Sequence, residues 1–271
     1  ALANSSYISS KYLTPLAGCK LSVILILGTQ LYSIWINVKN IIENIANFIE
    51  IMSPIILTLM IASGGKTSAT VYKPAVAFLS SGVVNIMINF ALPLIAVSLI
   101  FNIISSFSDN VKLTKFSDFA ISIFKWIVGI TSTVFSLFLS VQGIASSSFD
   151  GISLRATKYA ISNSIPIVGG FLRDGFDVFM AGSVLIKNSI GIIGIFVLFY
   201  IIVPPLIYMF LFSLSIKLIN AVTPSFADNR ISELFVNISK GISYLIAVIL
   251  IIGVMLFITI LLMIFSANYV L

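Results

Sequence analysis

Charged side chains that could carry chemistry are concentrated in one block of this chain, Asp150–Lys187. Within it, Asp174 and Asp177 stand three residues apart and could act as paired carboxylates in acid–base chemistry or ion binding. The chain has no histidine and a single cysteine, which excludes imidazole bases, His-based zinc sites and cysteine clusters. We therefore interpret the two carboxylates as residues that open a helix, where acidic side chains stabilise the helix dipole. The sequence predicts no enzyme, and no catalytic, metal-binding or cofactor-binding residue.

Lys187, the last charge of the block, precedes a long apolar stretch and allows two interpretations. If the helix that begins near Asp177 continues unbroken, the lysine lies inside the membrane. There it costs about 2.5–3.5 kcal/mol and needs a carboxylate, a water-filled cavity or snorkelling to the membrane surface. If the span begins at Asn188, the lysine is an anchor at the membrane surface. We single out six residues of the block as candidate assembly or gating residues: Arg155, Lys158, Arg173, Asp174, Asp177 and Lys187.

A second motif, Ser63–Thr67, reads SGGKT and resembles the end of a phosphate-binding loop. The full motif needs a glycine where Met60 stands, and it follows a buried strand that no pattern predicts here. We therefore expect a glycine turn between two membrane segments.

The elements that position these residues must lie in a membrane, because 59% of the chain is hydrophobic and only 9% is charged, with a mean hydropathy of +1.16. An average soluble domain carries roughly 25% charged residues. The net charge of +6 is spread over several loops. Such a spread favours contact with the anionic headgroups of a lipid bilayer and not with nucleic acid.

Uncharged runs long enough for a bilayer predict an all-α, polytopic helical membrane protein with about five to seven membrane segments. Five segments are firm, and we expect broken helices near Pro93 and near Pro204–Pro205. The number of segments rises if the broken runs are hairpins. Residues 1–20 form a polar N-terminal segment that we expect to be truncated or processed. Residues 21–271 form a single integral membrane domain, with the charged block 150–187 between two spans.

Three amphipathic stretches, 37–50, 112–125 and 228–240, lead directly into apolar segments. In each stretch, polar and apolar residues recur at spacings of three and four and so occupy opposite faces of a helix. We interpret the stretches as interfacial helices that lie in the headgroup plane and turn into a span. The alternative is that their apolar faces pack on other protein.

A stripe of small residues follows one helix: Gly129, Ser132, Ser136, Ser140 and Gly143. In lipid, small residues let helix backbones approach closely, so the stripe predicts a helix-packing face. Its partner is either another helix of the same chain or a neighbouring subunit.

The central part of the chain, Gln142–Ile195, resembles the stage III sporulation protein AE family. It reads QGIASSSFDGISLRATKYAISNSIPIVGGFLRDGFDVFMAGSVLIKNSIGIIGI, and its ordered charged and glycine positions carry the resemblance. The similarity extends upstream through IMSPIILTLMIASGGKTSATVYKPAV and FALPLIAVSLIFNIISSFSDNVKLTKFSD, and downstream into PSFADNRISELFVNISKG. It therefore covers about Ile51 to Gly241. Family members usually have a signal-like N-terminus and an additional region before the first span, which are absent or shortened in this sequence.

The resemblance implies a multi-pass protein of the mother-cell membrane that surrounds the forespore in a sporulating bacterium. The partners that it implies are the other products of the same operon, proteins AA to AH, and indirectly stage II sporulation protein Q. Together they form a channel or secretion-like apparatus that the forespore needs after engulfment. The family has no established catalytic residues. We therefore expect a non-enzymatic component of this channel complex, and we leave open whether the chain forms a homo-oligomer.

Two alternative functions belong to other classes. A small-solute permease acting with a partner ATPase would use Lys187 in a cavity at the middle of the membrane. A passive membrane scaffold for ring-forming partners would need no such cavity. Lysine and arginine are spread so evenly between the spans that the positive-inside rule predicts no orientation.

Overall fold

The protein is helical throughout the part of the chain that the structure describes. The computed structural model describes residues 2–105, 113–164, 169–223 and 229–266, and no strand occurs in these ranges. The predicted all-α fold with five firm membrane segments is confirmed. Five helical segments are long and apolar enough to cross a membrane: Leu25–Ala62, Lys66–Ser105, Thr114–Val141, Gly175–Val222 and Ile231–Phe265.

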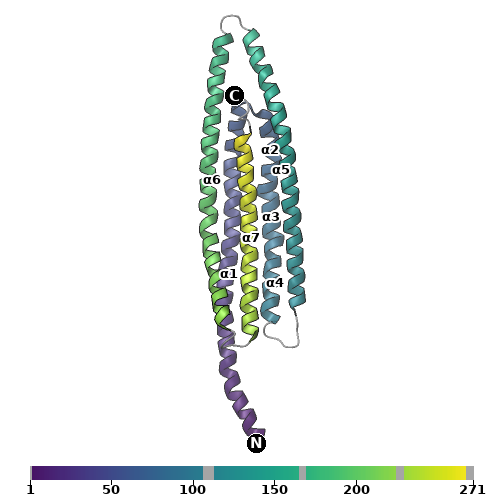
Figure 1. The fold of residues 1–271 in the computed structure, drawn as a ribbon, viewed down its shortest axis with the longest axis vertical. Coiled ribbons are helices and arrows are strands. Elements are labelled where there is room, and N and C mark those ends of the chain that lie inside the picture. Colours follow the sequence, from purple (N-terminus) through teal and green to yellow (C-terminus); the bar gives the residue numbers. More distant parts are fainter. Residues whose placement is uncertain (1, 106–112, 165–168, 224–228, 267–271) are drawn as a thin grey trace. The chain divides into compact units, whose positions relative to one another are not determined.

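Figure 1 shows the order of the helices along the chain. The first long helix is α1, and the second long helix is built from five consecutive segments, of which η1 and η2 are π-helical. Three long helices follow. The bounds are α1 Leu2–Ala62, α2 Lys66–Ala77, η1 Phe78–Val83, α3 Val84–Ile86, η2 Met87–Ala91, α4 Leu92–Ser105, α5 Thr114–Ser164, α6 Gly169–Val222 and α7 Asn229–Phe265.

The chain divides into two compact units, Ala1–Asn40 and Ile41–Leu271. In the second unit, α7 packs against α4, α5 and α6 and is the central helix. It is the most apolar of the five spans, and half of its most apolar part is buried. A helix that is hydrophobic all round belongs in the interior of a bundle. The boundary that we expect near residue 20 stays a prediction.

The glycine turn predicted at Ser63–Thr67 is present between α1 and α2. Gly64 has a φ of 88°, in the left-handed region that glycine enters without strain. The Gly65 amide donates to the Met60 carbonyl and the Gly64 amide to the Ile61 carbonyl, which is the hydrogen-bond pattern of a Schellman motif. This turn ends α1 at Ala62, and α2 begins at Lys66 after three intervening residues.

The expected helix breaks near Pro93 and at Pro204–Pro205 are wrong. α6 runs through both Pro204 and Pro205, and α4 continues past Pro93. A proline ring collides with the carbonyl four residues earlier, which for Pro93 is that of Asn89. The π segment η2 widens the helix at this place, and the Leu92 amide donates to the Met87 carbonyl. The number of spans therefore stays at five.

The three amphipathic stretches are not separate helices, which corrects the expectation of interfacial helices that turn into spans. They are parts of α1, α5 and α7, because no residue between stretch and span breaks the helix. Their apolar residues, such as Ile45, Phe124 and Ile238, are buried in protein. The alternative interpretation, an apolar face packed on other protein, describes them correctly.

Candidate functional site

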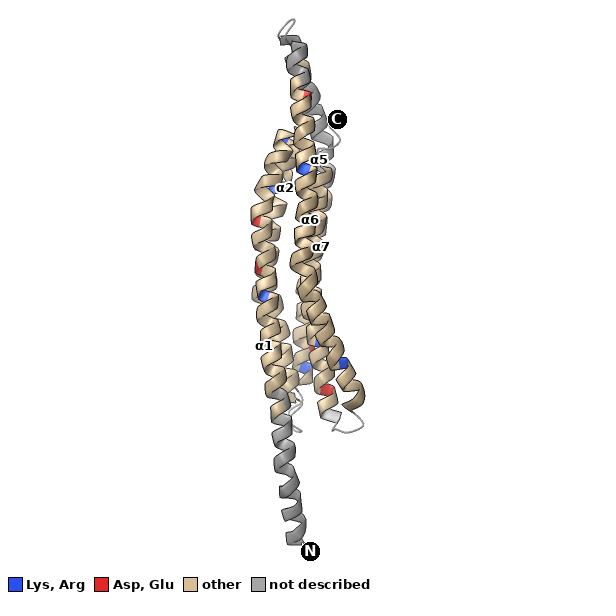
Figure 2. Cartoon of the chain, turned by 90° about the vertical axis from the view of Figure 1, so that its left-hand side faces the viewer, with Lys and Arg blue, Asp and Glu red and all other residues tan. Residues whose placement is uncertain are grey.

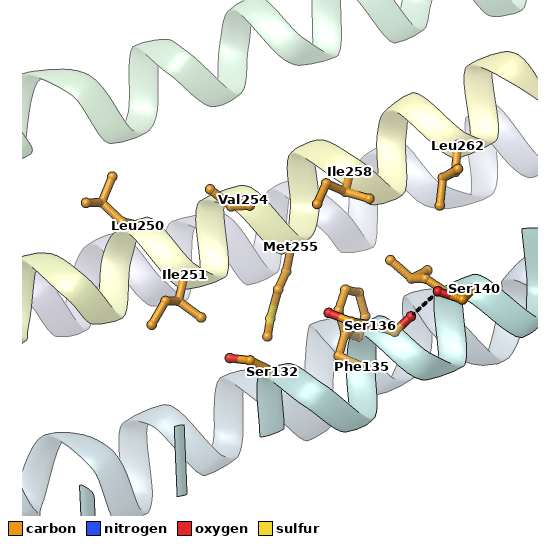
Figure 3. Close-up of a pocket in the computed structure, with 11 residues that line it drawn as sticks. Ser132, Phe135, Ser136, Ser140, Leu250, Ile251, Val254, Met255, Ile258 and Leu262 are labelled. Atoms are coloured by element: carbon orange, nitrogen blue, oxygen red, sulfur yellow. Dashed lines mark hydrogen bonds between the residues drawn. The ribbon is translucent and has the colours of Figure 1, made fainter. Parts of the chain in front are cut away.

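The predicted stripe of small residues lines an open groove between α5 and α7. Figure 3 shows Ser132 and Ser136 on α5 facing the α7 side chains across this space. The groove has a volume of about 670 Å³. Its walls are Ser132, Phe135, Ser136, Leu139 and Ser140 of α5 and Leu250, Ile251, Val254, Met255, Ile258 and Leu262 of α7.

The groove is apolar although three serines line it. The Ser140 hydroxyl donates to the Ser136 carbonyl of its own helix at 2.8 Å, the dashed line in Figure 3. Such a bond satisfies the hydroxyl without a partner from outside. Phe135 and Leu139 are buried and join α5 to the bundle beneath the serines. The groove therefore suits an apolar helix or chain better than a polar solute.

The stripe is not where α5 approaches another helix of this chain most closely. A Cβ added to Gly129 would meet no atom within 4 Å, and Ser136 and Ser140 are exposed. The surroundings of Gly143 lie outside the described side chains. A second hollow of about 420 Å³ adjoins the same helix at Lys125, Trp126 and Gly129. Tryptophan and lysine are typical of the end of a membrane span.

Close helix packing occurs instead between α6 and α7. A Cβ on Gly191 would overlap Ile264, and one on Gly253 would lie 2.6 Å from the Ile202 side chain. The sequence analysis missed these glycines, because a lone glycine in an apolar run has no recurring spacing. What identifies these glycines is that each faces a branched side chain of the neighbouring helix, and only the fold shows which residues face each other.

Lys187 is fully buried and lies at the end of α7. Its ammonium donates to the carbonyl oxygen of Ser266, 2.5 Å away, directly after the last residue of α7. The last carbonyls of a helix have no partner within the helix and carry partial negative charge, so a lysine there stabilises the helix end. The lysine therefore stands where the α7 span ends. It does not line the α5–α7 groove.

The other candidate residues of the charged block flank the hairpin between α5 and α6. Pro166 and the two glycines predict a turn here, and α5 ends at Ser164 while α6 begins at Gly169. Both helices extend past the end of α7 (Figure 1). Asp177 on α6 is half-buried. The side chains of Arg155, Lys158, Arg173 and Asp174 lie outside the described part.

Among the described residues, no three histidine, cysteine, aspartate or glutamate side chains come close enough to hold a metal ion. What the described side chains form is a packing surface: the groove, the glycine contacts, and buried hydroxyl pairs. Ser98 and Ser117 join α4 to α5 at 2.7 Å, and Ser213 and Ser239 join α6 to α7 at 3.0 Å. Such a surface binds and holds helices.

The sequence was compared with known proteins. It is 29% identical over 247 residues to stage III sporulation protein AE of Bacillus subtilis (strain 168), an alignment that covers 91% of this chain. The chain spans 62% of the length of that relative. No solved structure matches. The model of the stage III sporulation protein AE family matches residues 12–267, and the chain therefore belongs to this family.

Proposed function

We propose that the protein is a non-enzymatic component of the channel or secretion-like complex that joins mother cell and forespore. It resides in the mother-cell membrane around the forespore and acts with proteins AA to AH and indirectly with stage II sporulation protein Q. Membership in a sporulation family and five membrane-spanning helices support this proposal. The observation that carries it is the open α5–α7 groove.

The groove is long enough to hold a stretch of one helix. Its α7 wall extends from Leu250 to Leu262, which is about 18 Å of helix at 1.5 Å per residue. Its α5 wall offers serines, and small residues are what transmembrane helices use for close approach. We infer that a membrane helix of another subunit of the complex occupies the groove.

The permease alternative receives no comparable support. It requires Lys187 to face a cavity near the middle of the membrane, whereas the Lys187 ammonium lies at the end of α7. The scaffold alternative differs from the proposal only in whether material passes, and both need the groove occupied.

The test is to fill the groove. Ser140→Leu places a bulky side chain in it, and Ser215→Leu is the matched control. Ser215 is an exposed serine on α6 whose hydroxyl also bonds to its own helix. Each variant replaces the native protein in the sporulating host, and heat-resistant spores are counted at equal membrane levels. We expect a loss of spores for Ser140→Leu, because a clash that costs about 1.4 kcal/mol weakens association about tenfold, and no loss for Ser215→Leu. Normal spores from a strain that lacks the protein would overturn the proposal.

A further inference from the structure

A row of polar residues follows the outward face of the helix built from α2 to α4. Ser81, Asn85 and Asn89 stand four residues apart, and all three are exposed. In a regular α-helix, residues four apart rotate by about 40° at each step. The π segments η1 and η2 have more residues per turn and rotate the row back. The three side chains therefore form a nearly straight line, which we call the α3 row.

Contacts with the neighbouring helices set the depth of the α3 row. Before the row, the Phe78 ring stacks on Phe135 with centroids 6.5 Å apart, and Phe135 lines the groove opposite Met255 of α7. After the row, Leu99 packs against Gly241 of α7. The row thus lies at the level of α7 between Gly241 and Met255.

At this level α6 and α7 are apolar, whereas α1 carries Glu43 and Glu50 on either side of Asn44 and Asn47. From Gly241 to Phe265 α7 contains no charged residue, and α6 contains none from Asn188 to Ile216. Figure 2 shows charged residues on α1 beside the uncharged middle of α6. The outward residues of α6 at this level are large and apolar, such as Ile207 and Phe210. Lipid tails therefore surround α6 where the α3 row presents two amides.

A second polar row lies on α1 at the same depth. Asn44 and Asn47 are exposed, and we call them the α1 row. Just beyond it, Met52 of α1 lies against Gly194 of α6, where a Cβ would be 2.7 Å from the Met52 methyl group. Asn47 lies 17 residues before Gly64 and Ser81 lies 17 after it, so antiparallel helices place the two at one level. Asn44 and Asn85, 20 and 21 residues from the turn, form the next level.

Neither row can remain in contact with lipid tails without a free-energy cost. A carboxamide in hydrocarbon loses its hydrogen bonds to water, and the tails offer none in return. A carboxamide carries both donors and an acceptor, so it pairs with another carboxamide or with a hydroxyl. The partner that supplies such groups at matching depths is the other row on a second copy of this chain. Rotation about the membrane normal, which relates copies of the same orientation, leaves every depth unchanged.

We propose that the protein self-associates in the membrane by placing the α1 row of one copy against the α3 row of the next. The Asn47 amide then donates to the Ser81 hydroxyl, which itself donates to the Ala77 carbonyl of its own helix at 2.7 Å, and Asn44 meets Asn85. One such head-to-tail interface gives partners to the α1 row and to Ser81 and Asn85 of the α3 row, and repetition around the membrane normal closes a ring. The assembly deepens the proposed conduit role, but its test does not depend on that role.

The experiment cross-links two differently tagged copies in one membrane. Both carry Cys19→Ser, one carries Asn47→Cys and the other Ser81→Cys, and both are produced at full length in a bacterium that does not sporulate. After mild oxidation, a disulfide-linked pair bearing both tags is measured on a gel. Asn44→Cys with Asn85→Cys is the second matched pair. Asn47→Cys with Asn89→Cys is the control, because Asn89 lies eight residues, about 12 Å, deeper than Ser81. Tyr200→Cys with Ser81→Cys is a lipid-facing control, since Tyr200 is 80% exposed on α6.

The matched pairs are expected to give at least about fivefold more linked product than either control, as the 12 Å offset exceeds disulfide reach. Adding Asn44→Leu to one copy and Asn85→Leu to the other should lower the Asn47–Ser81 product at least about threefold. Equal products from matched and mismatched pairs would overturn the proposal. So would a disulfide that forms only when both cysteines are in the same copy. Labelling of both rows by a water-soluble thiol reagent in the assembled membrane would also overturn it, because the rows would then line water. A negative result leaves the spore counts, and hence the proposed function, untouched.

Discussion

The two sides of α7 are packed in different ways. Towards α6, Gly191 and Gly253 admit Ile264 and Ile202 so closely that no Cβ fits between the helices. Towards α5, serines face α7 across a groove of about 670 Å³. The chain thus closes the contact between α6 and α7, which we call the closed seam, and leaves the side of α7 towards α5 open. The difference teaches that a small residue indicates close helix packing within the chain only where a branched side chain of the opposite helix fills the space beside it.

The largest expected effect tests the closed seam. Gly191→Ala forces Ile264 to move, and overpacking of this kind costs typically about 1–3 kcal/mol. Gly182→Ala is the matched control on the same helix, where an added Cβ meets nothing within 4 Å. It should stabilise the protein by up to about 1 kcal/mol through helix propensity. Unfolding in detergent measures both, and shifts in the same direction would contradict the comparison.

The end of that seam depends on Lys187. Lys187→Met removes the hydrogen bond to the Ser266 carbonyl and leaves the end of α7 without its cation. We expect a loss of about 1–3 kcal/mol, the usual consequence of leaving a buried acceptor unsatisfied. Lys217→Met, at an exposed lysine on the same helix, should change stability by less than about 0.5 kcal/mol. Hydrogen exchange at the last turn of α7 should rise in Lys187→Met alone.

A smaller effect is expected on the outward side of α6. Pro204→Ala restores an amide that can donate to the Tyr200 carbonyl four residues earlier. Since α6 is already helical through this position, the gain is one hydrogen bond, about 0.5–1.5 kcal/mol. A loss of stability in the same detergent assay would show that the proline shapes the seam with α7.

The smallest change in stability is expected in the open groove. Ser140→Leu, the variant that should reduce sporulation, fills space that the chain itself leaves empty. Its free energy of unfolding should stay within about 0.5 kcal/mol of the original protein, as for most exposed substitutions. A large destabilisation would mean that the groove closes in the folded chain, and the two sides of α7 would then be alike.

Composition and the order of charges were enough to predict membrane helices, and the glycines predicted the turn at Gly64. The helix that we expect Asp174 and Asp177 to open begins earlier, at Gly169, and its first turn holds no acidic residue. The predicted helix breaks at the prolines are wrong, because the rule that proline ends a helix comes from chains in water. In a membrane helix the freed carbonyl has little water to bond to, so breaking more hydrogen bonds brings no gain. η2 is a π-helical segment that widens the helix just before Pro93, so the helix continues past this proline.

Other features could not be read from one sequence because they join residues far apart in the chain. The place of Lys187 depends on where α7 ends, 79 residues later. The depth of Asn85 depends on the contacts of Phe78 and Leu99 with α5 and α7. The spacing of four between Ser81, Asn85 and Asn89 is visible in the sequence and could have marked the row.

The depth of each polar row in the membrane depends on the number of residues that separate it from the turn at Gly64. One residue inserted into α2 would shift Ser81 along its helix by about 1.5 Å and rotate it by about 100°. The α1 row would stay in place, so the two rows would no longer match in depth or direction. In the proposed assembly, the length of chain between this turn and the asparagines therefore matters as much as the asparagines themselves.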